Sequence, residues 1–228
     1  MLAFALALVT LALLLGGCTT TQQKSARAKV VANRLLAARK PLLVKRANPS
    51  VGILRTTIVG RRAVVVRLRN RRPQVAEDLP ITVGIRHGGY FNRRGDLDYL
   101  ETHVPAIAAG GEATWVFTST RRIGARGTPF ARVGGSAAKP PAALPEVRVS
   151  VVAVRGATVT ARVTNPSDIP QYGLGVFAYA TRGGRPVAAG RAVIRHLGTG
   201  AATSVRIPVA GSLRGAALHV DAAPSTLR

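Results

Sequence analysis

The sequence predicts an all-β fold in which two antiparallel β-sandwiches follow one another along the chain. Three observations support this fold class. Apolar residues alternate with polar residues at a period of two, which is typical of strands that have one face on a core. Glycine and proline are frequent, with 24 and 14 residues, and they favour turns over long helices. An internal repeat places the same pattern in both halves of the chain.

The internal repeat relates residues 62–70 to residues 157–165 at an offset of 95 positions. Asn70 matches Asn165 at the end of this segment, and towards the C-terminus the offset falls to 90. Solenoid repeats have periods of roughly 20–50 residues, so a repeat of this length predicts two domains.

The strands of each copy are indicated by their alternation and by the turns that follow them. Val64, Val66 and Leu68 alternate with Val65, Arg67 and Arg69, so we expect the first set on a core and the second in water. Turn residues follow at 70–73, 165–168 and 182–185. Asn70 and Asn165 close matching strands, and we expect their side chains to bond the local backbone; the alternative is a ligand contact.

The N-terminal segment has the features of a signal peptide. An uncharged apolar run at 2–15 is too short for a membrane span of about 20 residues, and it leads to Gly16, Gly17 and the single cysteine, Cys18. Leu15–Cys18 resembles the lipobox of bacterial lipoproteins. The resemblance implies that residues 1–17 are a signal peptide, that Cys18 is the lipid attachment site, and that the mature protein is extracytoplasmic and held to a membrane. It does not say which membrane. The family's usual Lys or Arg before the apolar run is absent here.

Residues 18–50 form a basic tether in this interpretation. Eight basic residues and no acidic residue lie between positions 24 and 46. Val31, Leu35 and Ala38 have roughly helical spacing, so a short helix that ends at Pro41 is expected. The tether either lies against anionic head groups, with about 1 kcal/mol per basic residue, or serves as a solvated spacer.

The remaining chain divides into a first β-sandwich at 51–135, a Gly/Pro-rich linker at 136–145 and a second β-sandwich at 146–228. The second copy contains Val159–Ser167, Gly173–Tyr179, Gly184–Gly190 and Ile194–Gly200 in that order. This arrangement resembles the FxLYD-type family of immunoglobulin-like bacterial surface domains, although Val176–Tyr179 stands where that family has its name motif. The resemblance implies immunoglobulin-like sandwiches in an envelope-associated interaction or accessory module, without catalytic residues.

The net charge of +24 points to an anionic partner or to codon composition, because 28 of the 33 basic residues are arginine. An exported protein rarely meets nucleic acid, so we expect no nucleic acid partner. The polyanions that remain are lipid head groups, wall polymers and surface glycans. The expected partners are the membrane, through the lipid on Cys18, and an anionic envelope polymer or an envelope protein.

The best contact residues in the sequence lie in a loop of the first copy, which is five residues longer there than in the second copy. We expect partner contacts from Tyr90, Phe91, Arg93, Arg94 and Tyr99, because function concentrates on loops. The alternative is an ordinary hairpin insertion.

No residue pattern in the chain indicates catalysis or a cofactor. Asp96, Asp98, Glu101 and His103 lack the spacing of a calcium loop, so no metal site is expected. The histidines are scattered, and no nucleophile elbow, P-loop or dinucleotide fingerprint is present. Trp115 lies in an alternating strand, and we expect it in the core.

These observations predict a non-enzymatic, lipid-anchored protein of the cell envelope that acts as an interaction or accessory module. Two alternatives remain open. One is a structural spacer, and the other is a small-molecule or peptide carrier, which would need a pocket within or between the sandwiches.

Overall fold

The computed structural model describes residues 44, 46–86, 97–136 and 143–225, and all of their regular secondary structure is β. The predicted all-β fold is confirmed. The described residues do not include residues 1–43, and therefore not Cys18, nor most of the predicted linker. The predicted loop residues Tyr90, Phe91, Arg93 and Arg94 lie outside them as well.

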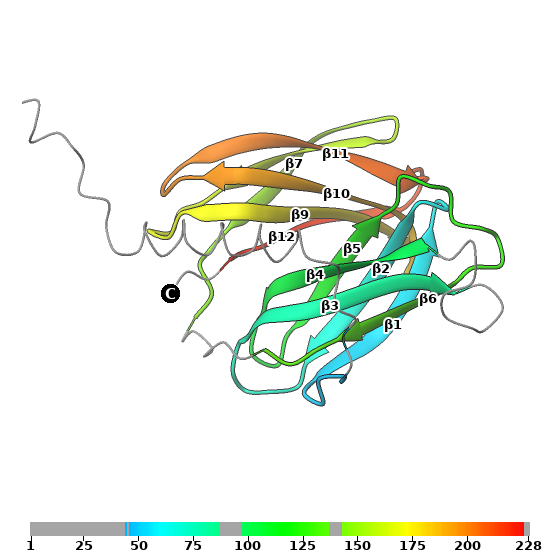
Figure 1. The fold of residues 1–228 in the computed structure, drawn as a ribbon. Coiled ribbons are helices and arrows are strands. Elements are labelled where there is room, and N and C mark those ends of the chain that lie inside the picture. The colour runs from blue at the N-terminus through cyan, green and yellow to red at the C-terminus, as the bar shows by residue number, and fades with distance from the viewer. Residues whose placement is uncertain (1–43, 45, 87–96, 137–142, 226–228) are drawn as a thin grey trace, which may run out of the picture.

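Six strands in two three-stranded sheets form the first sandwich (Figure 1). The strands are β1 Val51–Val59, β2 Ala63–Asn70, β3 Ala76–Arg86, β4 Leu97–Ile107, β5 Glu112–Thr118 and β6 Thr128–Val133. One sheet has the order β1-β2-β5 and the other has the order β4-β3-β6, and all pairs are antiparallel. The core between the sheets contains Leu68, Ile81 and Ile107, each at most 1% exposed.

Six further strands form the second sandwich in a single curled sheet of order β12-β9-β10-β11-β8-β7. The strands are β7 Arg148–Arg155, β8 Thr158–Thr164, β9 Gln171–Arg182, β10 Arg185–Leu197, β11 Ala202–Gly211 and β12 Ala217–Ala223. The strand order repeats that of the first sandwich, because β7, β8 and β11 correspond to β1, β2 and β5. Strand β11 joins the two halves: residues 202–208 pair with β8, and residues 209–211 pair with β10.

The repeat in the sequence is matched by identical local structure at Asn70 and Asn165, both fully buried. Asn70 Nδ2 donates to the carbonyls of Gln74 and Ala108 at 2.7 and 3.1 Å. Asn165 Nδ2 donates to the carbonyls of Ile169 and Gly198 at 2.9 and 3.1 Å. Each asparagine therefore ties the turn after its own strand to the loop that precedes the fifth strand of its sandwich. The structural role predicted for these residues is confirmed.

The two sandwiches pack directly against each other. In Figure 1 the second sandwich, coloured yellow to red, lies against β5 and β4 of the first. Phe177 of β9 and Ala189 of β10 belong to the buried cluster of the first sandwich. Gly60, at φ +57°, lies so close to the end of β11 that a Cβ atom there would overlap the backbone of Gly211. The molecule therefore has a continuous apolar contact where the sequence suggested two separate cores.

One expectation about strand faces is wrong at a single position. Val65 was expected in water with Arg67 and Arg69, but it is 1% exposed and shares a buried cluster with Ala189. Because part of this sheet face is covered by the second sandwich, Val65 is buried although it points away from the core of its own sandwich.

Candidate functional site

Of the five contact residues that the sequence predicts, Tyr99 lies within the described residues. Cys18, Tyr90, Phe91, Arg93 and Arg94 lie outside the described residues. Tyr99 lies in β4, one of the edge strands of its sheet. The structure directs attention instead to the contact between the sandwiches.

Trp115 is the centre of this contact. It lies on β5 and is 2% exposed, so the predicted core position is confirmed. Its ring centroid is 4.8 Å from that of Phe177 on β9, with an interplanar angle of 54°. Because β5 is an edge strand, Trp115 reaches the border of its own core and packs against the neighbouring sandwich.

Arg191 of β10 completes an aromatic–cationic cluster with these two rings. Its guanidinium carbon lies 4.9 Å from the Trp115 centroid and 5.7 Å from the Phe177 centroid. Burial lowers the pKa of Arg191 below its ordinary value. Its Nε and the Nε1 of Trp115 are both buried, and neither has a hydrogen-bond partner in the part of the chain described. The cation is therefore stabilised here by ring faces, which attract cations electrostatically.

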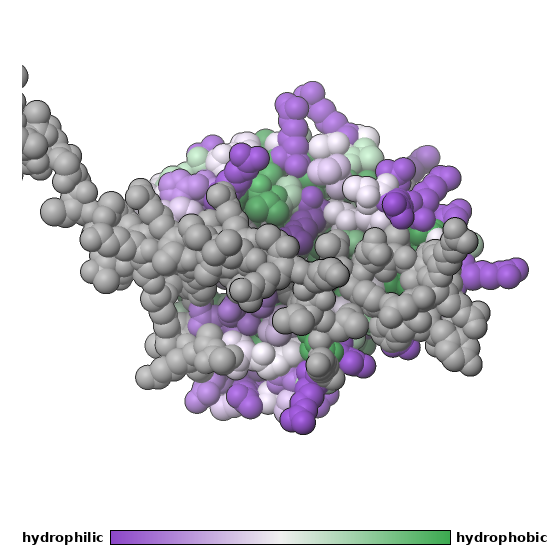
Figure 2. Space-filling view, viewed as in Figure 1, coloured by the Kyte–Doolittle hydropathy of each residue, from purple (hydrophilic) through white to green (hydrophobic). Residues whose placement is uncertain are grey.

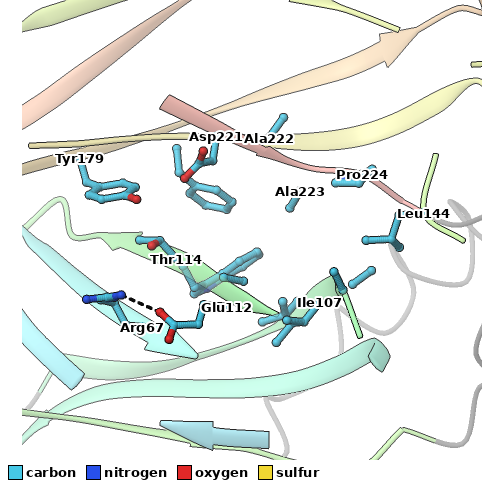
Figure 3. Close-up of a pocket in the computed structure, with 16 residues that line it drawn as sticks. Arg67, Ile107, Glu112, Thr114, Leu144, Tyr179, Asp221, Ala222, Ala223 and Pro224 are labelled. Carbon is cyan, nitrogen blue, oxygen red and sulfur yellow. Dashed lines mark hydrogen bonds and ion pairs between the residues drawn. The ribbon is translucent and has the colours of Figure 1, made fainter. Parts of the chain in front are cut away.

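A pocket of about 350 Å³ opens beside this cluster, between the two sandwiches (Figure 3). We call it the interdomain pocket. Its walls come from β2, β4 and β5 of the first sandwich, from β9 and β12 of the second, and from the segment around Leu144. Pockets of roughly 300–1,000 Å³ between domains are common ligand sites.

Polar groups gather at one end of the interdomain pocket, as Figure 3 shows. Arg67 Nη2 and Glu112 Oε2 form an ion pair at 2.6 Å across β2 and β5. Thr114, Tyr179 and Asp221 lie beside this pair. The strand registers explain the grouping. Arg67 on β2 is the register partner of Thr114 on β5. Asp221 on β12 is the register partner of Phe177 on β9, and Tyr179 is two residues further along β9, on the same face of the sheet.

The phenol of Tyr179 remains protonated at neutral pH. Burial raises the pKa of Tyr179 above its usual value of 10.0, and Asp221 adds to the rise. Thr114 and Arg67 oppose this shift. Tyr179 also stacks on His219 of β12, with centroids 5.0 Å apart and an interplanar angle of 18°. The ring is thus fixed in place, and its hydroxyl group is hydrogen-bonded to the side chains of Thr114 and Asp221.

A second feature is an arginine-rich surface on the outer face of the β1-β2-β5 sheet. Arg55 and Arg67 are register partners, so both project from this face. Arg69 pairs with Gly52, and the guanidinium of Arg71 lies 3.0 Å from the position that a Gly52 Cβ would occupy. We call Arg55, Arg67, Arg69 and Arg71 the arginine face. All four are exposed, and Glu112 pairs with Arg67 and, at 3.9 Å, with Arg69.

In the described ranges no group of three or more His, Cys, Asp or Glu side chains could hold a metal ion. No helix among the residues with described structure has the length and apolarity needed to cross a membrane.

The sequence did not predict that Phe177, Tyr179, Arg191 and Asp221 lie together. One signal was available for the first two, because Leu174–Ala180 is apolar without interruption. Such a run indicates a strand that is buried on both faces, so something must cover the outer face of β9. The identity of the covering residues depends on domain packing, which no local pattern encodes.

Comparisons with known proteins add little to this description. No family model matches the chain, and no curated protein matches it. Among solved structures, it is similar to a transglutaminase of red sea bream, at 15% identity and a TM-score of 0.26, over 90% of this chain and 32% of that chain. It is also similar to an exo-chitosanase of Amycolatopsis orientalis, at 14% identity and a TM-score of 0.28, over 76% and 26%. The chain thus spans about a third or less of these proteins, and the scores are too low to carry an argument about activity.

Proposed function

We propose that this protein is a lipid-anchored, extracytoplasmic and non-catalytic module that holds an anionic component of the cell envelope against its arginine face. The anchor is the part of the proposal that rests on sequence, on the apolar run followed by Cys18. The observation that carries the binding function is the arginine face itself.

The arginine face has an arrangement that is unfavourable without a counter-ion. Like charges directly opposite each other on neighbouring strands repel, and Arg55 faces Arg67 in this way. Among the described residues, Glu112 is the carboxylate that pairs with this face, and it pairs with two of the four guanidinium groups, those of Arg67 and Arg69. Guanidinium groups bind phosphate and carboxylate oxygens with paired hydrogen bonds. A polyanion laid across the sheet would remove the repulsion and use this geometry.

The packing of the two sandwiches supports a binding module over a flexible spacer. Phe177 and Trp115 bury one sandwich against the other, so the arginine face is part of a stiff unit. Figure 2 shows long hydrophilic side chains projecting from the described surface, with smaller apolar areas between them. A rigid face keeps its charges at fixed spacings, and less entropy is lost when a polymer binds.

A glycerol phosphate polymer is a suitable probe for the arginine face. Full-length protein in neutral detergent is titrated with the polymer, and a variant carrying Arg55→Gln, Arg67→Gln, Arg69→Gln and Arg71→Gln is compared with the wild type. The control carries Arg121→Gln, Arg122→Gln, Arg126→Gln and Arg155→Gln, which remove the same charge from other exposed positions. We expect at least tenfold weaker binding for the first variant only, together with weakening by salt.

Equal losses in the two variants would show that binding follows total charge, and the proposed binding face would then be wrong. The absence of any binding would overturn the proposed polyanion-binding function. The anchor is tested separately by mass spectrometry of the membrane fraction. We expect an acylated N-terminal Cys18 in the wild type and loss of membrane attachment in Cys18→Ser.

A further inference from the structure

Acidic residues outnumber basic residues among those that line the interdomain pocket, whereas basic residues predominate in the chain as a whole. The chain has 33 basic and nine acidic residues. Two of those nine acidic residues, Glu112 and Asp221, line the pocket, whereas Arg67 is the one basic residue that lines it among those the structure describes. A site with more carboxylates than cations, in a protein of this composition, favours a ligand that carries positive charge.

Asp221 is the pocket carboxylate whose charge is not balanced by a described cation, although its side chain is hydrogen-bonded to Tyr179. Glu112 is already paired with Arg67 at 2.6 Å. Asp221 lines the pocket and is exposed, and it forms no ion pair with the residues whose structure is described. Its neighbour Tyr179 adds a hydroxyl group at the same end (Figure 3).

The other end of the pocket is apolar. Ile107, Leu144, Ala223 and Pro224 lie there, away from the polar group, as Figure 3 shows. The rings of Trp115 and Phe177 also line the pocket. A molecule that fits must therefore combine a polar head with an apolar portion. The volume of about 350 Å³ is at the lower end of the range for ligand sites and limits the molecule to a small one.

We propose that the interdomain pocket binds a small amphiphilic cation, with an ammonium group beside Asp221 and Tyr179 and an apolar portion against Trp115 and Ile107. Arg67 belongs both to the arginine face and to the pocket lining. The two proposed ligands have opposite charge, so a titration with each ligand tests one proposal without the other.

The only tryptophan of the chain provides a direct reporter, because Trp115 lines the pocket. Full-length protein in neutral detergent is titrated with hexylammonium, hexan-1-ol and hexanoate, and the tryptophan emission is followed. We expect a saturable change with hexylammonium, a change at higher concentration with hexan-1-ol, and none with hexanoate over the same range.

The charge assignment is tested with Asp221→Asn, which removes the charge of this exposed side chain and keeps its size. We expect this variant to bind hexylammonium at least tenfold more weakly while its response to hexan-1-ol is unchanged. Asp168→Asn is the matched control, since Asp168 is not among the residues that line the pocket. It should bind hexylammonium as the wild type does.

Three results would overturn the proposal. One is the absence of a saturable response to hexylammonium. Another is an equal response to the three probes, which would indicate partition into the detergent or unspecific apolar binding. The last is an equal effect of Asp221→Asn and Asp168→Asn, which would show that total charge alone governs binding.

Discussion

The rings of Trp115 and Phe177 lie 4.8 Å apart and join residues from two different sandwiches. Each is at most 2% exposed, so each completes the burial of the other. Tilted aromatic pairs at this distance contribute about 0.5–1.5 kcal/mol beyond the area they bury. The interdomain pocket lies beside this pair, and any ligand there depends on the sandwiches remaining in contact.

Arg191 covers the two rings, and its replacement separates the effects of charge and packing. Arg191→Met keeps most of the volume and removes a buried cation whose Nε lacks a hydrogen bond. We expect unchanged or higher stability, because desolvation of a buried charge costs several kcal/mol while a cation–π contact returns about 2 kcal/mol. Arg191→Ala should destabilise by about 2 kcal/mol through lost packing. Equal destabilisation of the two variants in urea would contradict this account.

Gly190 marks the place where β11 crosses to β10. It pairs with Val209, and a Cβ atom at Gly190 would overlap the carbonyl oxygen of Pro208. We expect Gly190→Ala to cost about 3 kcal/mol, as overpacking does when backbone must move. Gly198→Ala is the control, because its Cβ would meet no atom closer than 3.8 Å. Thermal unfolding of both variants gives the comparison, and equal melting temperatures would be inconsistent with the close crossing.

Asn70 and Asn165 should be equally important, because they make the same hydrogen bonds. Replacement by alanine leaves several carbonyl groups without their buried donor, and each such loss costs about 1–3 kcal/mol. We therefore expect Asn70→Ala and Asn165→Ala each to destabilise by about 3 kcal/mol in denaturant titrations. A cost below about 1 kcal/mol for either variant would mean that water replaces the side chain and that the turn does not depend on it.

The raised pKa of Tyr179 predicts that the folded protein loses stability at alkaline pH. Because burial raises its pKa in the folded state above 10.0, the unfolded chain loses the phenolic proton first. Stability is therefore fully present below about pH 10 and falls as the pH rises towards the folded-state pKa. Tyr179→Phe cannot ionise, and its stability should fall less steeply in urea titrations between pH 9 and pH 11. Parallel curves for the wild type and the variant would contradict the burial of the phenol.

The sequence predicted the strands well, because their signals are local. Alternation at Val64, Val66 and Leu68 and the turn at Asn70 identified β2 and its end, and the repeat carried the same interpretation to β8. Asn70 and Asn165 were correctly predicted to bond the backbone, since the side chain and its acceptors are partly close in sequence.

The interdomain site was not predicted, because it is assembled from residues far apart in the chain. Arg67 and Asp221 are more than 150 positions apart and belong to different sandwiches. Val65 shows the same limit, since its burial depends on which surface covers it. The uninterrupted apolar run around Phe177 indicated that β9 was covered, but not that β5 and Trp115 were nearby.

The central claim is that the two sandwiches form one cooperative unit through Phe177 and Trp115. It is tested most directly by urea unfolding of the full-length Phe177→Ala protein, followed by Trp115 emission and by far-ultraviolet circular dichroism. Phe177 belongs to the second sandwich and the reporter belongs to the first. We predict that both probes show one shared transition, shifted by about 3–5 kcal/mol from the wild type. A Trp115 transition that stays at the wild-type midpoint while the circular dichroism divides into two steps would contradict the claim.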